Sequence, residues 1–323
     1  MSTLSDWIPF EEKYCLFLGA GFSKCAANLP TARELFDFKL TNIGSVEEKR
    51  IIRLKKIKDS WDKSNPQDNI EEFISHLLEA SDSQKKLIIW YIGRRLADPF
   101  IIEDYENHRR VIKIDEDLKF EIDGVKKARQ LLNHFISPSL EGIITTNYDL
   151  LVEYTLGAKA FHYGKKMQKL YGAGPNSKYP FFQATFLTGS LPLLKLHGSI
   201  SLTDMGYCTD GRGGITGKSL LVPPTHNKKV FKFVEDEWNI AKNVLNNSAT
   251  LIIFGFAFNE YDIELLQLLK NSTPSVKKVI LINTNSTIKK RAQTIWKANK
   301  IIQITPDDLN TIDIQRMITG SNQ

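Results

Sequence analysis

The stretch Cys15-Leu16-Phe17-Leu18-Gly19-Ala20-Gly21-Phe22-Ser23-Lys24 decides the fold class of this chain. A short apolar run, predicted as a buried strand over residues 14–18, ends in two glycines separated by one alanine. A helix-start signal follows, because Thr31 and Glu34 have the spacing of a capping box. Glycines let backbone approach backbone, and the amides of a helix N-terminus favour an anion. The stretch therefore predicts a nucleotide-binding turn.

This motif alone leaves a second interpretation open. Lys24 stands where the dinucleotide fingerprint requires its third glycine. A buried strand that simply ends in a flexible turn would explain the same residues. A second glycine-rich stretch, residues 213–219, fails the P-loop spacing because Arg212 stands where a glycine is needed. We therefore expect a mobile loop there and no ATP hydrolysis.

Composition indicates an ordinary globular protein. The 323 residues are 42% hydrophobic and 25% charged, and no apolar stretch approaches the roughly 20 residues that cross a bilayer. The first residues lack the features of a signal peptide, so we expect a cytoplasmic protein with no membrane contact. Lysines and arginines exceed acids by 43 to 37 but are spread over helices, which disfavours direct nucleic-acid binding.

Three cysteines provide neither a disulfide framework nor a Cys-x-x-Cys zinc pair, and we expect no metal site. Cys15 falls in the predicted first strand, where a small buried apolar residue is the favoured role.

The chain alternates strand-like and helix-like patterns, which predicts an α/β fold: a Rossmann-like parallel sheet with helices on both faces. The expected strands are short apolar runs at 14–18, 142–145, 193–196, 251–254, 279–282 and 301–304. The expected helices cover 31–41, 149–156, 234–245, 262–269 and 287–298. Residues of about 46–135 show helical spacing without a convincing strand run. We interpret them as a helical insertion, or a small helical domain, in a sheet domain built from about 1–45 and 136–323.

Polar residues follow four of the predicted strands. They occur in Thr145-Thr146-Asn147-Tyr148-Asp149, Leu196-His197-Gly198-Ser199, Gly255-Phe256-Ala257-Phe258-Asn259 and Asn283-Thr284-Asn285. In open α/β sheets a ligand lies outside the carboxyl ends of the strands, near the switch in strand order. These four strand ends and the Gly-Ala-Gly turn are therefore expected to meet around one crevice.

At these residues the chain resembles the sirtuin-like family, and in particular its bacterial antiphage-defence branch of NAD-hydrolysing proteins. The matching pieces, in the family's order, are Gly19–Ser23, Leu29–Thr31, Thr146–Asp149, Lys195–Ser199, Gly255–Asp262 and Leu281–Asn283. The resemblance spans most of the chain outside the helical insertion. It departs from protein-deacylating sirtuins, which have a four-cysteine zinc module and an Asp-Phe-Arg sequence where this chain has Thr31-Ala32-Arg33.

The resemblance implies NAD as the substrate, and it implies roles for individual residues. Asn147 and His197 would be catalytic, with Asp149 supporting the Asn147 loop. The pyrophosphate would bind the turn, Asn283 the adenosine ribose, and Gly255 would close over the nucleotide. The residues implied in NAD binding are Gly19, Ala20, Gly21, Phe22, Ser23, Thr31, Thr146, Gly255, Phe256 and Asn283.

These residue types suit cleavage of the bond between nicotinamide and ribose. An amide side chain offers both a donor and an acceptor to orient the substrate, and histidine exchanges a proton near neutral pH. Simpler roles stay open: Asn147 could cap a helix, and His197 could be a structural histidine. Asp149 and Asp262 could serve helix first turns, where acids are favoured.

The expected function is therefore an NAD hydrolase that produces nicotinamide and ADP-ribose as an antiphage-defence effector. The absence of the zinc module disfavours a peptide substrate, which leaves water as the acceptor. Two alternatives are an NAD-dependent protein deacylase and a sensor that binds NAD or ADP-ribose without turnover. The family resemblance also suggests a HerA-type ATPase or another defence protein as a partner, and we expect a homo-oligomer.

Overall fold

The computed structural model of this chain describes residues 12–41, 43–98, 102–104, 109–111, 123–157, 160–167, 189–203, 206–207, 219–222, 232–297, 299–312 and 314–319. Its centre is a seven-stranded sheet in which every neighbouring pair is parallel. The strands are β1 (Tyr14–Leu18), β4 (Leu140–Thr145), β5 (Phe161–His162), β6 (Leu191–Lys195), β10 (Thr250–Phe254), β11 (Lys278–Ile282) and β12 (Lys300–Ile304). The parallel α/β prediction is confirmed, and all six predicted strands are present.

The strand order is β12-β11-β10-β1-β4-β6-β5, so β1 lies in the middle. The chain first builds the sheet on one side of β1 and then crosses to β10 on the other side, which places the switch in strand order beside β1. Leu18, the last residue of β1, pairs with Thr145 and with Phe254. The strands therefore end level with one another, and the residues that follow them share one edge of the sheet.

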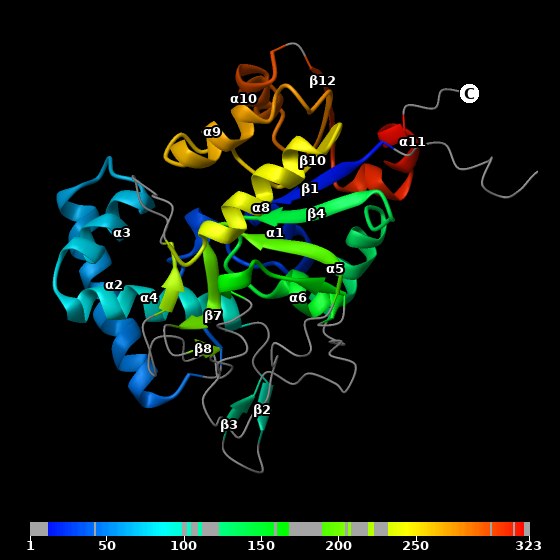
Figure 1. Cartoon of the computed structure of the whole chain (residues 1–323). Coiled ribbons are helices and arrows are strands. Elements are labelled where there is room, and N and C mark those ends of the chain that lie inside the picture. Colours follow the sequence, from blue (N-terminus) through cyan, green and yellow to red (C-terminus); the bar gives the residue numbers. More distant parts are fainter. Residues whose placement is uncertain are drawn as a thin grey trace, which may run out of the picture.

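Helices cover both faces of the sheet (Figure 1). Alternate residues of β1 divide between two apolar clusters, as expected for a strand buried on both sides. One face packs against α1 (Ala20–Ala27), α5 (Asp123–Asn133), α6 (Leu151–Leu156) and α11 (Ile314–Thr319). The other packs against α8 (Glu235–Asn246), α9 (Ile263–Asn271) and α10 (Thr287–Ile295).

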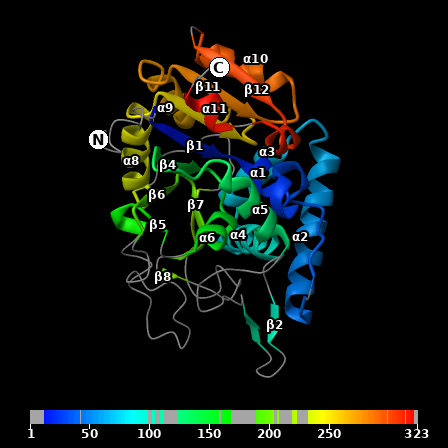
Figure 2. The same ribbon diagram turned by 90° about the vertical axis from the view of Figure 1, so that its right-hand side faces the viewer.

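The insertion contains α2 (Ser45–Ser64), α3 (Ile70–Glu79) and α4 (Asp82–Ala97), which confirms its helical character. The side chain of Asn69 accepts from the amide of Glu72, and the Glu72 carboxylate accepts from the amide of Asn69, which fixes the start of α3. Phe73 and Tyr91 are fully buried between these helices. Figures 1 and 2 show the insertion on the side of the molecule toward which the strands run.

Among the described residues, two small β elements lie outside the main sheet, and neither was predicted. The insertion carries a hairpin of β2 (Ile102–Asp104) and β3 (Arg109–Val111). A three-stranded antiparallel sheet of β7 (Gly198–Thr203), β8 (Gly206–Tyr207) and β9 (Ser219–Leu221) follows β6. The glycine-rich residues 213–218 lie outside the described residues.

The predicted helix at 31–41 is wrong. The first helix, α1, begins at Ala20 directly after the glycine turn, and Asn28 ends it in the left-handed conformation with φ of 51°. A 3-10 turn at Ala32–Glu34 follows, and the described residues 35–41 and 43–44 form no helix or strand. Half of the capping box is nevertheless present, because the Glu34 carboxylate accepts from the Thr31 amide at 3.0 Å.

Two further observations concern cysteines and membrane spans. Cys15 is fully buried in β1, and this burial raises the pKa of its thiol to about 12, which confirms the prediction of an apolar role. Within the described ranges, no helix combines the length and apolar character needed to cross a bilayer.

Candidate active site at the carboxyl edge of the sheet

The turn between β1 and α1 packs directly against the turn after β10. A Cβ added to Gly19 would lie 2.6 Å from the Gly255 carbonyl oxygen, and one added to Gly21 would lie 2.6 Å from the Gly255 Cα. Gly255 itself has φ of 67°, and a Cβ there would lie 2.3 Å from the Phe22 amide nitrogen. Glycine is required at all three positions because two backbones touch there.

These contacts occupy some of the backbone amides at the start of α1 that were predicted to bind a phosphate. The Gly21 amide donates to the Gly255 carbonyl at 2.8 Å, and the Phe22 amide donates to Gly19 at 3.0 Å. The Phe22 ring packs edge-on against Phe254 in the core. Ala20, in contrast, is exposed at the start of α1. Among these residues, Ala20 presents the accessible surface of the turn, and the Phe22 side chain serves the fold.

Asn147 is fastened to this turn. Its side-chain amide donates to the Gly19 carbonyl at 3.0 Å and to the Ser23 hydroxyl at 2.9 Å. Its own backbone amide donates to the Thr145 hydroxyl at 3.0 Å. Asn147 is 7% exposed and does not cap α6, which begins four residues later. The structure thus brings Asn147, Gly19 and Ser23 together, as predicted, from elements 120 residues apart and more.

A buried ion pair lies beneath the Asn147 loop and was not predicted. Lys195, the last residue of β6, donates to the Asp149 carbonyl and to the Glu153 carboxylate, the latter at 2.8 Å. The Tyr163 hydroxyl donates to the same Glu153 oxygen at 2.8 Å. Both charged side chains are at most 2% exposed. A lysine in an otherwise apolar strand was the sequence signal for this cluster.

Asp149 lies between the Asn147 loop and α6 and contacts both α6 and β6. Its carboxylate accepts from the amide of Leu151, the first residue of α6, at 3.0 Å. Asp149 itself precedes the N-cap residue Leu150. Its backbone carbonyl is the atom held by Lys195. The two contacts fix the backbone of Asp149, two residues after Asn147.

His197 lies two residues after the end of β6, directly before β7, and is 4% exposed. The Tyr148 ring lies beside it, with 6.1 Å between ring centroids, and the Asp262 carboxylate lies 4.0 Å from its Nε2. Burial, with the charges of Asp262 and Glu71 adding to it, holds the pKa of Tyr148 well above its ordinary value, so this phenol is neutral. A hollow beside His197 is lined in part by Asp262 and by Trp238 of α8.

The other predicted binding residues are divided between the sheet edge and the core. The Asn283 side chain, after β11, donates to the Phe256 carbonyl at 3.3 Å, so it joins two neighbouring strand ends. The Phe256 ring packs against Phe17 and Phe258 at 5.0 Å in each case. Phe256 is 6% exposed and is part of the core. Thr146 follows β4 and its amide donates to Leu18 at 3.3 Å.

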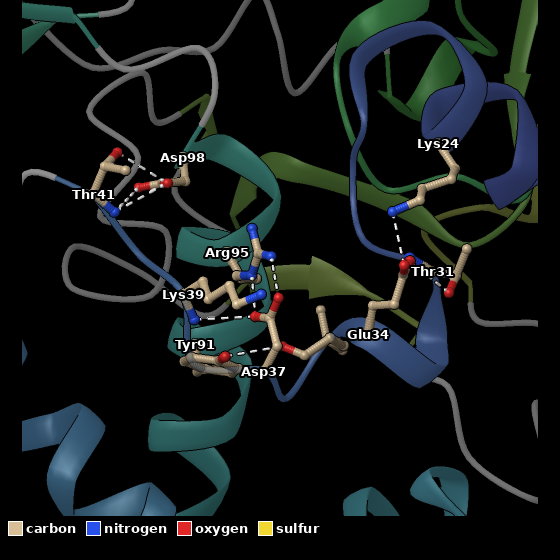
Figure 3. A network of polar contacts seen from close by, with 10 residues as sticks. Lys24, Thr31, Glu34, Asp37, Lys39, Thr41, Tyr91, Arg95 and Asp98 are labelled. Atoms are coloured by element: carbon tan, nitrogen blue, oxygen red, sulfur yellow. Dashed lines mark hydrogen bonds and ion pairs between the residues drawn. The ribbon is translucent and has the colours of Figure 1, made fainter.

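Thr31 begins a segment that leads from the turn to the insertion and is fixed at both ends (Figure 3). Near the turn, Glu34 pairs with Lys24 at 2.7 Å and accepts from the Thr31 hydroxyl. The Lys24 and Thr31 contacts lower the pKa of Glu34 to about 2. Farther along, Asp37 pairs with Arg95 of α4.

The far end of this segment is anchored on the same helix. The Thr41 amide and hydroxyl donate to Asp98, next to the end of α4, at 3.0 to 3.1 Å. Buried Arg94 also pairs with Asp98 and donates to the Thr41 carbonyl. The segment thus ties the glycine turn to the insertion.

The insertion also reaches the loop after β10, a contact that sequence reasoning missed. The Asn259 side chain donates to the Glu71 carboxylate at 3.0 Å, and the Asn69 side chain donates to the Tyr261 hydroxyl at 2.9 Å. Both insertion residues belong to the start of α3, and Tyr261 directly precedes Asp262. Nothing in the local sequence signals contacts between residues more than 180 positions apart.

A central parallel sheet, a glycine turn at the switch in strand order, and a buried asparagine and histidine at the carboxyl edge define a Rossmann-type α/β protein. A family model for the SIR2-like domain matches residues 141–304, which is more than half of the chain. The chain belongs to the SIR2-like family.

Solved structures that match this chain include a Sir2 homologue in complex with NAD, at 13% sequence identity and a TM-score of 0.41. That match covers 96% of this chain and 90% of the other. Another is a mutant Sir2 homologue in complex with 2′-O-acetyl ADP ribose, at 13% identity and a TM-score of 0.42, covering 95% and 92%. A search of curated proteins found no match.

Proposed function

We propose that this protein is an NAD hydrolase that cleaves the bond between nicotinamide and ribose. The observation that carries the proposal is the attachment of the Asn147 side chain to Gly19 and Ser23 of the glycine turn. The residue after Asn147, Tyr148, packs against His197. An amide and an imidazole are therefore held at the same edge of the sheet as the turn, where α/β proteins bind nucleotides.

The chemistry assigns a separate task to each side chain. When the bond from the ribose C1′ to the nicotinamide nitrogen breaks, its electron pair leaves with nicotinamide and positive charge develops on the sugar. Water then forms a bond to C1′ and loses one proton, which His197 can accept near neutral pH. Asn147 would hold the reacting groups in place, an effect that depends on its anchoring to the turn. The products are nicotinamide and ADP-ribose.

The test is nicotinamide release from NAD by the purified full-length protein, with Asn147→Ala and His197→Ala as variants. We expect each to lower turnover roughly 100-fold or more, because positioning and proton transfer each contribute at least that much. Asn246→Ala, at an exposed position at the end of α8, is the matched control and should retain wild-type turnover. Thermal unfolding of each variant verifies that the fold is retained.

Three results would contradict the proposal. Unchanged nicotinamide release in His197→Ala would remove the histidine from the reaction. Loss of NAD only when an acyl-lysine peptide is supplied and consumed would indicate a protein deacylase. Tight NAD binding without any turnover, with candidate partner proteins present, would indicate a sensor.

We further propose that NAD depletion by this protein serves antiphage defence in the cytoplasm. The support is the similarity of its motifs to the defence branch of the family. A homo-oligomer and a separately encoded HerA-type ATPase, or another defence protein, are the proposed assembly and partner. Light scattering that shows a monomer at all working concentrations would refute the homo-oligomer. Co-expression with neighbouring gene products, followed by purification and an NAD assay, tests the partner.

A further inference from the structure

Asp262 lies where the sequence suggests a helix-capping role, yet its side chain does not cap the helix. It occupies the N-cap position of α9, but its side chain makes no capping hydrogen bond there. The helix uses the Asp262 backbone carbonyl, which accepts from Leu266 at 2.8 Å. The carboxylate is 6% exposed and lies 4.0 Å from His197 Nε2. A buried acid that does not serve its helix faces the histidine.

The loop that carries Asp262 is held rigidly. It begins at Gly255, whose left-handed backbone packs against the glycine turn, and it passes through Phe258, a second left-handed residue with φ of 52°. The Phe258 ring is buried against Phe256 and Trp296. A non-glycine residue keeps such a backbone only where its surroundings fix it.

Polar contacts fix the rest of this loop. The Asp262 amide donates to the Asn259 carbonyl at 3.1 Å, and the Tyr261 amide donates to the Asn259 side chain at 3.2 Å. The opposite end of the Asn259 side chain donates to Glu71 of the insertion. These contacts therefore fix the position of Asp262 in the absence of substrate.

We propose that Asp262 is a positioning residue that stabilises the charged form of His197; this inference rests on the proposed function. A carboxylate within about 4–6 Å favours the protonated form of an imidazole, and more strongly where water is excluded. When water adds to C1′ and its proton passes to His197, the new imidazolium faces a negative charge. His197 is therefore a stronger base than an isolated histidine in the same position.

Other ionisable groups near His197 must be separated from this effect. Among the described residues, Tyr148 of the Asn147 loop packs against His197, and Glu264 of α9 lines the same hollow. Glu71 of α3 acts electrostatically on Tyr148. None of these residues is altered in the variants below. A difference in His197 titration between an Asp262 variant and wild type is therefore due to the change at position 262.

The experiment compares Asp262→Asn with wild type in two measurements. Asparagine has the same size and is equally good at a helix N-cap, so the fold should persist, and Asp262→Ser provides a second neutral variant. In the pH–rate profile of NAD turnover, the acidic limb of Asp262→Asn should shift to lower pH by about one unit. Its kcat should be reduced and its KM nearly unchanged. Glu260→Gln, which removes an exposed carboxylate from the same loop, should reproduce the wild-type profile.

The second measurement is an NMR titration of the His197 ring without NAD, assigned by loss of its signal in His197→Ala. The midpoint should fall by about one pH unit in Asp262→Asn and Asp262→Ser. Midpoints equal to wild type in both variants, with an unmoved pH–rate profile, would overturn the proposal. If wild-type protein does not consume NAD, the proposed function fails, and the titration still decides whether Asp262 acts on His197.

Discussion

Replacing Lys195 with methionine should destabilise the protein strongly, because it leaves the Glu153 carboxylate buried and unpaired. Lys195 and Glu153 are 1% and 2% exposed, and among the described residues Glu153 would retain only the Tyr163 hydroxyl as a donor. Its second carboxylate oxygen, Oε2, already has no hydrogen-bond partner among the described residues. Removing one member of a buried ion pair typically costs about 3–5 kcal/mol of unfolding free energy.

This cost can be converted into a melting temperature. For 323 residues, an unfolding entropy of about 2.1 cal/mol/K per residue gives a fall in Tm of roughly 4–7 °C. Glu153→Leu should have a similar effect. The double variant Lys195→Met/Glu153→Leu buries no charge and should recover more than half of the loss. About 1–2 kcal/mol should remain, because the Tyr163 hydroxyl and the Asp149 carbonyl lose partners.

Differential scanning calorimetry of the four proteins provides the assay. The matched control is Lys166→Met, which removes an exposed lysine paired with Glu235 at 2.8 Å and should leave Tm unchanged. The reasoning is refuted if Lys195→Met lowers Tm no more than Lys166→Met does. It is also refuted if the double variant loses the sum of the two single losses.

Gly255→Ala should destabilise the fold and weaken NAD binding, since its Cβ would lie 2.3 Å from the Phe22 amide nitrogen; urea unfolding and calorimetric titration with NAD measure the two effects. Burial raises the pKa of Glu237 to about 7, so the folded state binds a proton more tightly than the unfolded state. Protonation of Glu237 therefore stabilises the folded state fully below about pH 4.5, and this stabilisation, about 3 kcal/mol at most, is lost as the pH rises through 7. Glu237→Gln should make the unfolding free energy depend less on pH, which urea midpoints at pH 5 and pH 8 measure. Asn259→Ala should free Glu71 and speed hydrogen exchange at the start of α3, and an unchanged exchange rate there would show that this contact does not hold the insertion.

The sheet could be predicted from sequence because its strands are buried on both faces and therefore read as continuous apolar runs. Each run ends where polar residues begin, which also revealed the edge that carries Asn147 and His197. The two-residue strand β5 is too short to produce such a pattern. The antiparallel strands after β6 are short and interrupted, and they were missed for the same reason.

The first helix was misplaced because two start signals compete in the sequence. Thr31 and Glu34 form real capping contacts, but these close only a single 3-10 turn. Gly19 is the N-cap residue of α1, and because it has no side chain, the sequence contains no N-cap signal at this position. Asp262 shows the opposite case: α9 begins where predicted, yet the aspartate side chain is directed to a histidine 65 positions away. Such tertiary use of a side chain leaves no local trace.

The contact between Gly21 and Gly255 bears on how this family can be recognised and rebuilt. A Gly-Ala-Gly turn grafted onto another sheet would lack the opposing left-handed glycine against which its backbone rests, and would adopt a different shape. The transferable unit is the pair of turns, separated by more than 230 residues in the chain. A search for related proteins should therefore require both glycine sites at once, since neither has its observed geometry without the other.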